Sequence, residues 1–215
     1  MNKISDIPVT DEIVLRNGAA IMREHGKRLG QIMDEECGKI IRSDGHPRGK
    51  YHKIIRLATE IGKIHAPYSP CKQGCNHCCN MAVTITEYEA QRIAAFTGRS
   101  YVQQEAFDLF GSDSELARLD EKREKDAEKY IRVPCTFLTP EGCSIYSVRP
   151  LPCRLYHSLE ESNEQCRLGM AGERLKEVGQ LNLLPLEMAH VMTQMERIVL
   201  ADIREWFPAD APQSR

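Results

Sequence analysis

The chain has 215 residues, 41% of them hydrophobic, and a net charge of −2. This length fits one domain, and the balanced charge gives no reason to expect nucleic acid or an anionic membrane as a partner. Nine cysteines are the unusual feature. No stretch approaches the roughly 18 apolar residues of a membrane span, and the N-terminus lacks the apolar segment of a signal peptide. We therefore expect a cytoplasmic protein, in which cysteines stay reduced and serve as metal ligands.

The first third of the chain predicts helices. Apolar residues recur at every third or fourth position over residues 21–41, and a second stripe of this kind runs over residues 54–64. Glycines weaken the first stripe, so it predicts either one broken helix or two. Pro67 and Pro70 cannot continue the second helix and should end it. These elements form a helical flank over residues 10–65.

Further helices are predicted in the middle of the chain by capping boxes, in which Ser or Thr precedes Glu or Gln by three residues. The pattern occurs at residues 86–89, 100–103 and 112–115. A very short strand is expected at residues 83–85, where apolar and polar residues alternate. The mixed charges of residues 120–126 are expected to lie on a solvated helix face.

Two cysteine-bearing segments, 135–138 and 143–146, flank a turn at 139–142 and predict a β-hairpin. The stretch 182–207 carries methionine and aliphatic residues at helical spacing and is expected to be a core helix. We therefore expect a mainly α protein. It should be a single helical domain over residues 1–215, with a small irregular cysteine-rich hairpin and loop element at a metal site.

The cysteines themselves point to metal. Four thiols fall within nine residues in the pattern C-x3-C-x2-C-C, where Gly74 and Asn76 let the loop curl around an ion. Cys37 lies on the first apolar stripe and is expected to be a core residue. The other eight cysteines are the predicted metal ligands: Cys71, Cys75, Cys78, Cys79, Cys135, Cys143, Cys153 and Cys166.

The spacing of these thiols argues against one simple ion. Neighbouring Cys78 and Cys79 point to opposite sides of an extended chain. If Thr139 pairs with Cys143 in a regular hairpin, Cys135 lies about 13 Å along the strand. Two ligands of one zinc lie less than about 4.6 Å apart. We expect two metal centres, a polynuclear cluster, or an irregular hairpin. Eight thiolates suit two zinc sites, or one iron–sulfur cluster with the remaining thiols structural or redox-active.

Histidines and arginines near the cysteines in the sequence could take part in the metal site or have no role in it. His77 lies inside the cysteine run and His157 shortly after Cys153, so either imidazole could replace a thiolate. Arg149 and Arg154 are also close in sequence to Cys153. A guanidinium near thiolates would lower their pKa and offset the charge of a cluster, and the alternative is an exposed arginine.

The cysteine pattern resembles the YkgJ-type cysteine-cluster proteins over about residues 66–170. The motifs that carry the resemblance are the run Cys71 to Cys79, Pro134-Cys135-x-Phe137-Leu138, Cys143-x-Ile145-Tyr146, Arg149-Pro150 and Cys153-Arg154-x-Tyr156. The resemblance implies a core that chelates zinc or iron. A relative, the flagellin lysine N-methylase group, carries an iron–sulfur cluster. The C-x3-C-x2-C triad of radical S-adenosylmethionine enzymes also fits, but this chain lacks the alternating strands and helices of those enzymes.

We therefore expect a metal-binding cysteine-cluster protein with a redox, sensing or accessory role. Its metal should be an iron–sulfur cluster, and the type that we expect before any other is [4Fe–4S]. One alternative is a structural zinc module for protein interaction. Another is a metal-dependent protein-modifying enzyme that resembles flagellin lysine N-methylase. The sequence has no dinucleotide-binding or P-loop motif and assigns no catalytic residue. The expected partners are the metal and a protein, with neither nucleic acid nor membrane.

Overall fold

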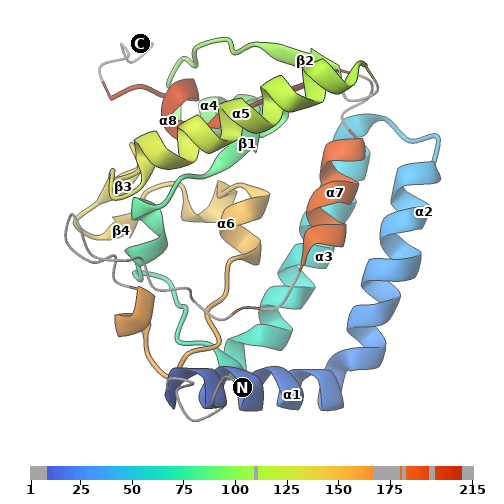
Figure 1. Cartoon of the computed structure of the whole chain (residues 1–215), viewed down its shortest axis with the longest axis vertical. Helices are drawn as coiled ribbons and strands as arrows, with labels where there is room; N and C mark the ends of the chain where they lie inside the picture. The colour runs from blue at the N-terminus through green and yellow to red at the C-terminus, as the bar shows by residue number, and fades with distance from the viewer. Residues whose placement is uncertain (1–8, 109–110, 167–179, 181–182, 194–196, 210–215) are drawn as a thin grey trace, which may run out of the picture.

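The structure is a computed structural model that describes residues 9–108, 111–166, 180, 183–193 and 197–209. Within these residues the fold is mainly helical, as predicted, with a few short strands. Figure 1 shows a helical part that contains α1, α2, α3 and α7, and a second part in which α4, α5 and α8 surround the strands. The cysteine-rich segments belong to the second part and lie next to α6.

The first third forms α1 (Val9–Gly30), a π-helical segment η2 (Gln31–Glu36), α2 (Cys37–Arg42) and α3 (Pro47–His65). The weakened stripe is thus one continuous helical run with a π-helical segment inside it. The chain changes direction between α1 and α2 (Figure 1), as is common where extra residues widen a helical turn. The apolar faces of these helices form a core whose fully buried members include Ile21, Ile32, Ile54 and Ile61.

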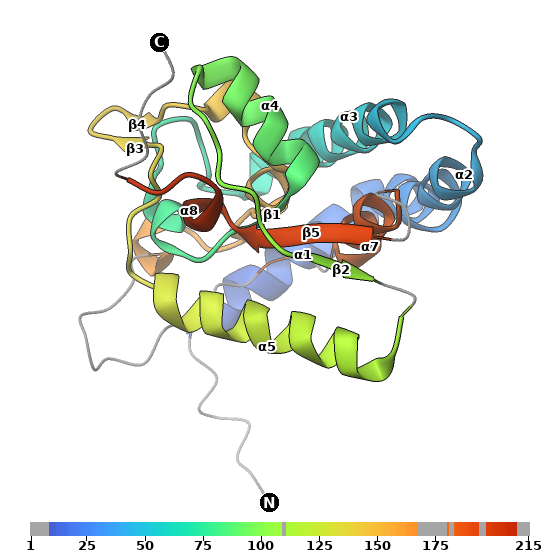
Figure 2. The same ribbon diagram turned by 90° about the horizontal axis from the view of Figure 1, so that it is seen from above.

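The second part is built on a three-stranded antiparallel sheet. Its central strand β5 (Arg197–Asp202) pairs with β1 (Thr84–Thr86) on one side and β2 (Ala106–Asp108) on the other. The helices α4 (Glu87–Thr97) and α5 (Asp113–Tyr130) belong to the same part, and Figure 2 shows α5 running alongside β2 and β5. Ile85, Ile93, Ile203, Trp206 and Phe207 are among the buried residues of its core.

The prediction of a helix over residues 182–207 is wrong. Here the chain forms α7 (Leu184–Met192), then strand β5, then the short helix α8 (Ile203–Trp206). The apolar run of β5 has buried side chains on both faces, since Ile198 and Leu200 lie in one hydrophobic cluster and Ala201 in another. Such a run has no alternation, so its periodicity cannot distinguish a strand from a buried helix.

Of the three predicted capping boxes, two lie at the start of a helix and one does not. At Thr86 the box is complete, since the hydroxyl accepts from the N–H of Glu89 and the Glu89 carboxylate accepts from the N–H of Thr86. The box at residues 112–115 lies at the start of α5, although the Ser112 side chain makes no capping bond. The box at 100–103 begins no helix. There the Val102 N–H donates to the Trp206 carbonyl at 2.9 Å, so tertiary bonds hold this segment extended.

The hairpin consists of β3 (Leu138–Thr139) and β4 (Gly142–Cys143). Leu138 pairs with Cys143 and Thr139 with Gly142, so the expected pairing of Thr139 with Cys143 is wrong by one residue. Cys135 lies before the ladder, where its carbonyl accepts from the N–H of Leu138 at 2.9 Å in a turn. The hairpin is therefore irregular, and the 13 Å separation of a regular strand does not apply to its cysteines.

Short helical turns complete the chain. The helix α6 (Leu151–Leu155) carries Cys153. The 3-10 turns are η3 (Ala66–Tyr68), η4 (His77–Asn80), η5 (Tyr146–Val148) and η6 (Asn163–Cys166). Within the described residues, every helix falls short of the length and apolar character that a bilayer crossing requires.

Two buried histidines, His65 at the end of α3 and His157 after α6, make the stability of the fold depend on pH. The rings of His65 and His157 pack edge to face with centroids 5.2 Å apart. His65 is 1% exposed, and neither of its ring nitrogens has a hydrogen-bond partner among the described residues. Burial, with a smaller contribution from His157, lowers the pKa of His65 from 6.5 to about 4. Between these values the unfolded chain binds a proton that the folded chain does not, so stability falls as the pH decreases, by roughly 3 kcal/mol in all.

Replacing His65 with leucine should remove this contribution. The loss of unfolding free energy between neutral pH and about pH 4 should be roughly 3 kcal/mol smaller in His65→Leu than in the unchanged protein. Urea unfolding at both pH values measures it. The exposed His52 provides the matched control, because His52→Leu should leave the pH profile unchanged. Parallel profiles for His65→Leu and the unchanged protein would contradict the prediction.

Candidate metal centre

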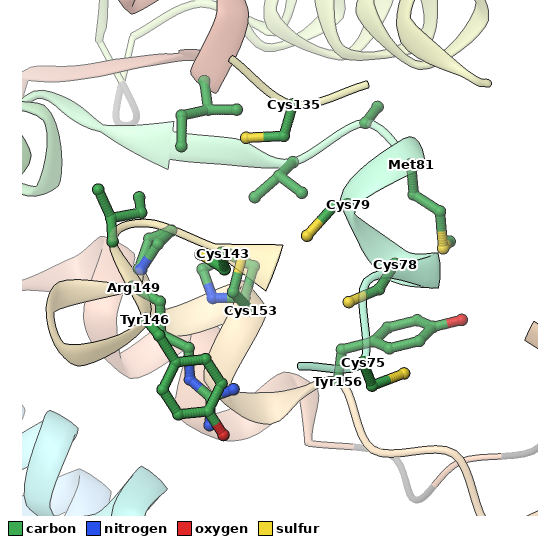
Figure 3. Close-up of a pocket in the computed structure, with 16 residues that line it drawn as sticks. Cys75, Cys78, Cys79, Met81, Cys135, Cys143, Tyr146, Arg149, Cys153 and Tyr156 are labelled. Carbon is green, nitrogen blue, oxygen red and sulfur yellow. The ribbon is translucent and has the colours of Figure 1, made fainter. Parts of the chain in front are cut away.

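Six of the eight predicted ligands border one cavity, whose volume is about 110 Å³. It lies between the turn η4, the hairpin and α6, and its remaining wall is largely apolar (Figure 3). The close-up shows thiols reaching this space from segments that are far apart in the sequence. The cysteines that border it are Cys75, Cys78, Cys79, Cys135, Cys143 and Cys153.

Two glycines allow the cysteine loop to approach the hairpin. Gly74 has a φ of 90° and Gly142 a φ of 115°, a backbone conformation that other residues rarely adopt. A Cβ atom on Gly142 would lie 3.3 Å from the Cα of Gly74, which is backbone and cannot easily move. A side chain at Gly142 would therefore press the loop away from the hairpin and enlarge the gap between Cys78 and Cys143.

Arg204 ties the cysteine-bearing segments together from the C-terminal part of the fold. The side chain is buried, with 5% of the residue exposed, and one of its nitrogens donates to the Asp202 carboxylate at 2.9 Å. Asp202 in turn accepts from the Val83 N–H at 2.6 Å. The remaining guanidinium nitrogens donate to four backbone carbonyls at 2.6–3.2 Å, those of Cys79, Met81, Val133 and Pro134.

The same segments are also joined directly. The N–H of Cys135 donates to the carbonyl of Cys79 at 2.7 Å, and the N–H of Arg132 donates to the carbonyl of Asn80 at 2.8 Å. Together with Arg204 these bonds fix the backbone of η4 against the segment that leads into the hairpin. The cavity is therefore held by backbone contacts that do not depend on the cysteine side chains.

Three of the thiols that border the cavity, those of Cys78, Cys79 and Cys143, influence one another's pKa values. The single proton of the Cys79 thiol can be donated either to the sulfur of Cys78 or to that of Cys143, and this interaction lowers the pKa of each from 9.0 to about 7. Burial opposes the shift, while the positive charge of Arg149 supports it. The pKa of Cys79 is raised by the same hydrogen bonds. The site thus stabilises thiolates at Cys78 and Cys143, the form that binds metal.

Cys153 and Cys135 contribute thiols that burial keeps protonated. Burial raises the pKa of Cys135 to about 11, and burial together with neighbouring thiolates raises that of Cys153 well above its usual value. Arg149 acts in the opposite direction on Cys153. A metal that binds here must displace these protons, so its affinity should depend on pH. We call Cys78, Cys79, Cys143 and Cys153 the central group.

The outer group consists of Cys71, Cys75 and Cys166, which approach one another beside the cavity. The N–H of Ser158 donates to the sulfur of Cys71 at 3.4 Å, and the Asn163 amide donates to that of Cys75 at 3.8 Å. Burial raises the pKa of Cys166 to about 11, and the nearby charges of Cys71 and Cys75 add to this. Figure 3 shows the sulfur of Cys75 turned away from Cys143 and Cys153. The eight thiols therefore fall into two neighbourhoods, with Cys135 at the apolar edge of the first.

The thiols surround a space and do not converge on a point. Within the described residues, no three Cys, His, Asp or Glu side chains are close enough together to hold one metal ion as they stand. Four ligands of one zinc would need their sulfurs less than about 4.6 Å apart.

The comparison with known proteins agrees with this chemistry. Residues 70–168 match the model of a family described as "CxxCxxCC: Putative zinc- or iron-chelating domain". This segment is similar to the CxxCxxCC family, and the match covers less than half of the chain. No curated protein and no solved structure matches the chain. The match confirms the resemblance to a metal-chelating cysteine-cluster family, over nearly the range that the motifs predict.

The CxxCxxCC match ends before α7, β5 and α8, so Arg204 lies outside it. Sequence reasoning missed this residue. The signal in the sequence was the pair Asp202 and Arg204 in the largely apolar run 198–207, because charged residues in such a run are rarely buried unless they are paired. Arg149, which was weighed as a thiolate neighbour, borders the cavity, and Arg154 donates to the Arg149 and Ser147 carbonyls at 2.8 and 2.7 Å.

The histidines weighed as substitutes for a thiolate lie elsewhere. His77 is in η4 but is not among the residues that border the cavity. His157 packs against His65, and its Nδ1 lies 3.2 Å from the carbonyl of Leu155.

Cys37 lies at the start of α2 in the helical core, outside the segment that matches the family model, and is 3% exposed. Burial raises the pKa of its thiol to about 11. We predict that Cys37→Ala keeps the full metal content of the protein and lowers the free energy of unfolding by about 1 kcal/mol, the effect of a small lost packing contact. Elemental analysis and urea unfolding measure the two quantities. Metal loss in Cys37→Ala would show that the helical core takes part in the site.

Proposed function

We propose that the CxxCxxCC domain of this protein holds an iron–sulfur cluster of the [4Fe–4S] type and acts in electron transfer or redox sensing. The observation that supports this most is the arrangement of the thiols around a cavity of about 110 Å³ without convergence on one point. A single zinc ion needs convergent sulfurs, whereas a polynuclear cluster lies between its ligands and keeps them farther apart.

The central group, Cys78, Cys79, Cys143 and Cys153, would supply the four thiolates of the cluster. Cys78 and Cys143 are the thiols whose pKa values are lowered to about 7, so they would bind first. The outer group and Cys135 would then be structural or redox-active thiols, or ligands of a second metal. All eight cysteines thus keep a proposed role in the metal chemistry of the domain.

Arg149 fits an anionic group in this cavity. Its guanidinium stacks on the Tyr146 ring, 4.2 Å from the centroid, and it lowers the pKa values of three thiols of the central group. Its Nε is buried and has no hydrogen-bond partner among the described residues. A buried donor without a partner is costly, and a cluster sulfur would accept its hydrogen bond. When bound, the cluster supplies one-electron transfer; Arg149 would stabilise the more negative, reduced state.

The apolar wall of the cavity would exclude water from such a centre. Val83, Ile145 and Ile203 border it, and two of these are fully buried. Exclusion of water strengthens the influence of Arg149, because charges interact more strongly in a low dielectric. We place this protein in a reducing compartment, the cytoplasm, with a redox protein as its partner. The metal unit would comprise residues 66–170 together with β5 and α8, within one domain that includes the flanking helices.

A redox titration tests this function. Anaerobically purified protein should show a reversible one-electron step, followed by electron paramagnetic resonance. Arg149→Met should keep the cluster and shift the potential to a more negative value by tens of millivolts, because the reduced state loses a nearby cation. Arg118→Met, which removes an exposed arginine distant from the cysteine cavity, serves as the control and should leave the potential unchanged. A protein without a reversible step contradicts the redox role.

A further inference from the structure

A second cavity, with a volume of about 240 Å³, lies among α5, α6, α7, β1 and β5. It shares only Pro152 with the cavity of the cysteines, so the two are separate spaces on either side of α6. Its volume is below the range of about 300–1,000 Å³ that is usual for drug-sized ligands, so a ligand here must be small. Its walls are mostly apolar and include Leu119, Leu151, Val191 and Leu200.

Two opposite charges border this cavity and are not paired with each other. Glu187, on α7, is half-buried, and no described residue forms a hydrogen bond or an ion pair with its carboxylate. Arg123, on α5, has an ion-pair contact with Asp120 at 3.8 Å in which both side chains are more than half exposed. Such a surface pair contributes little, so the Arg123 guanidinium remains available. Both residues border the same cavity, and the positive charge of Arg123 opposes the rise that burial causes in the pKa of Glu187.

The floor of the cavity holds a further polar atom without a partner. Glu89 is fully buried, and its carboxylate accepts from the N–H groups of Leu151 at 2.7 Å and Thr86 at 3.0 Å. The Nε2 of His190 lies 3.4 Å from the same carboxylate. His190 is 3% exposed, and its Nδ1 has no hydrogen-bond partner among the described residues. A buried polar atom of this kind beside a cavity indicates a place for a polar group of a ligand.

We propose that this cavity binds a free α-amino acid with an apolar side chain. The ammonium group would pair with Glu187 and reach the Nδ1 of His190, the carboxylate would pair with Arg123, and the side chain would fill the apolar space beside Leu119 and Leu200. A simple amine would leave Arg123 without a partner, and a simple acid would leave Glu187 without one. A zwitterion satisfies both charges and fits the small volume. This site does not depend on the metal centre.

Isothermal titration calorimetry with the full chain tests the proposal, with L-leucine, L-valine and L-methionine as probes. At least one should bind. For leucine, removal of one charge gives a matched pair of analogues: 4-methylpentanoate lacks the ammonium group, and L-leucinamide lacks the carboxylate. Each analogue should bind at least about tenfold more weakly, since each loses one charge-assisted hydrogen bond.

The variants identify which side chain recognises which charge. Glu187→Gln should abolish the preference for the amino acid over the analogue without an ammonium group, and keep the preference over the amide. Arg123→Gln should do the reverse. Glu124→Gln, next to Arg123 on α5 but outside the lining of the cavity, should change neither preference. The absence of binding by all three amino acids would overturn the proposal, and so would equal binding of leucine and its two analogues.

Discussion

Replacing Arg204 with methionine should destabilise this protein by about 3–5 kcal/mol and remove most of its metal. The buried guanidinium binds four backbone carbonyls and Asp202, and its loss leaves a buried carboxylate without its partner. Because Cys79 and Cys135 lie on the segments that Arg204 joins, their thiols would no longer face the same cavity. Urea unfolding and elemental analysis of the purified variant measure the two effects.

Arg204→Lys separates positioning from folding. Lysine keeps the charge beside Asp202, but its single ammonium group cannot reproduce the planar fork that bonds both cysteine-bearing segments. This variant should therefore fold, with a metal affinity well below that of the unchanged protein. Arg56→Met, at an exposed arginine of α3, is the matched control and should alter neither quantity. If Arg204→Lys folds and binds metal with full affinity, the contacts of Arg204 with the backbone do not organise the site.

Replacing Cys79 with serine should remove the metal from the central group. Cys79 interacts with both Cys78 and Cys143, and its thiol lowers the pKa of each. Its backbone carbonyl, which Arg204 and Cys135 bind, is unaffected by the change. Metal binding stabilises the folded chain, so the melting temperature should also fall.

The comparison that isolates the role of Cys79 is the same substitution at a buried cysteine outside the domain. Cys37→Ser places serine in the helical core, where it should lower stability but not metal content. Elemental analysis of both variants, purified in parallel without oxygen, measures the contrast. A full metal complement in Cys79→Ser would mean that the metal is held elsewhere, for example by the outer group.

Local patterns predicted the elements that depend on local physics. The stripes of the first third became helices, and the box at Thr86 became a helix start, because spacing and capping act within a few residues. The strand β5 escaped prediction because its identity depends on β1 and β2, its neighbours in the sheet. The hairpin register was off by one residue, since a two-residue ladder is too short for its pattern to fix the pairing.

The candidate site also has some features that the sequence predicts and others that it does not. The spacing of the cysteines and the exclusion of Cys37 follow from the sequence, because metal chemistry and helical periodicity both leave local marks. The contribution of Arg204 does not, since it lies 125 residues from Cys79 and acts through backbone carbonyls, which any residue provides. The approach of Gly74 to Gly142, which brings the cysteine loop to the hairpin, joins segments far apart in the sequence and is likewise not predicted by a local pattern.

The measurement that tests the proposed metal centre most directly is the content of iron, acid-labile sulfide and zinc in anaerobically purified protein. A cluster that fills the cavity between the thiols requires about four iron and four sulfide per chain, with a brown colour that fades in air. Colourless protein with zinc and no sulfide would contradict it, because zinc would then have drawn the thiols together around single ions.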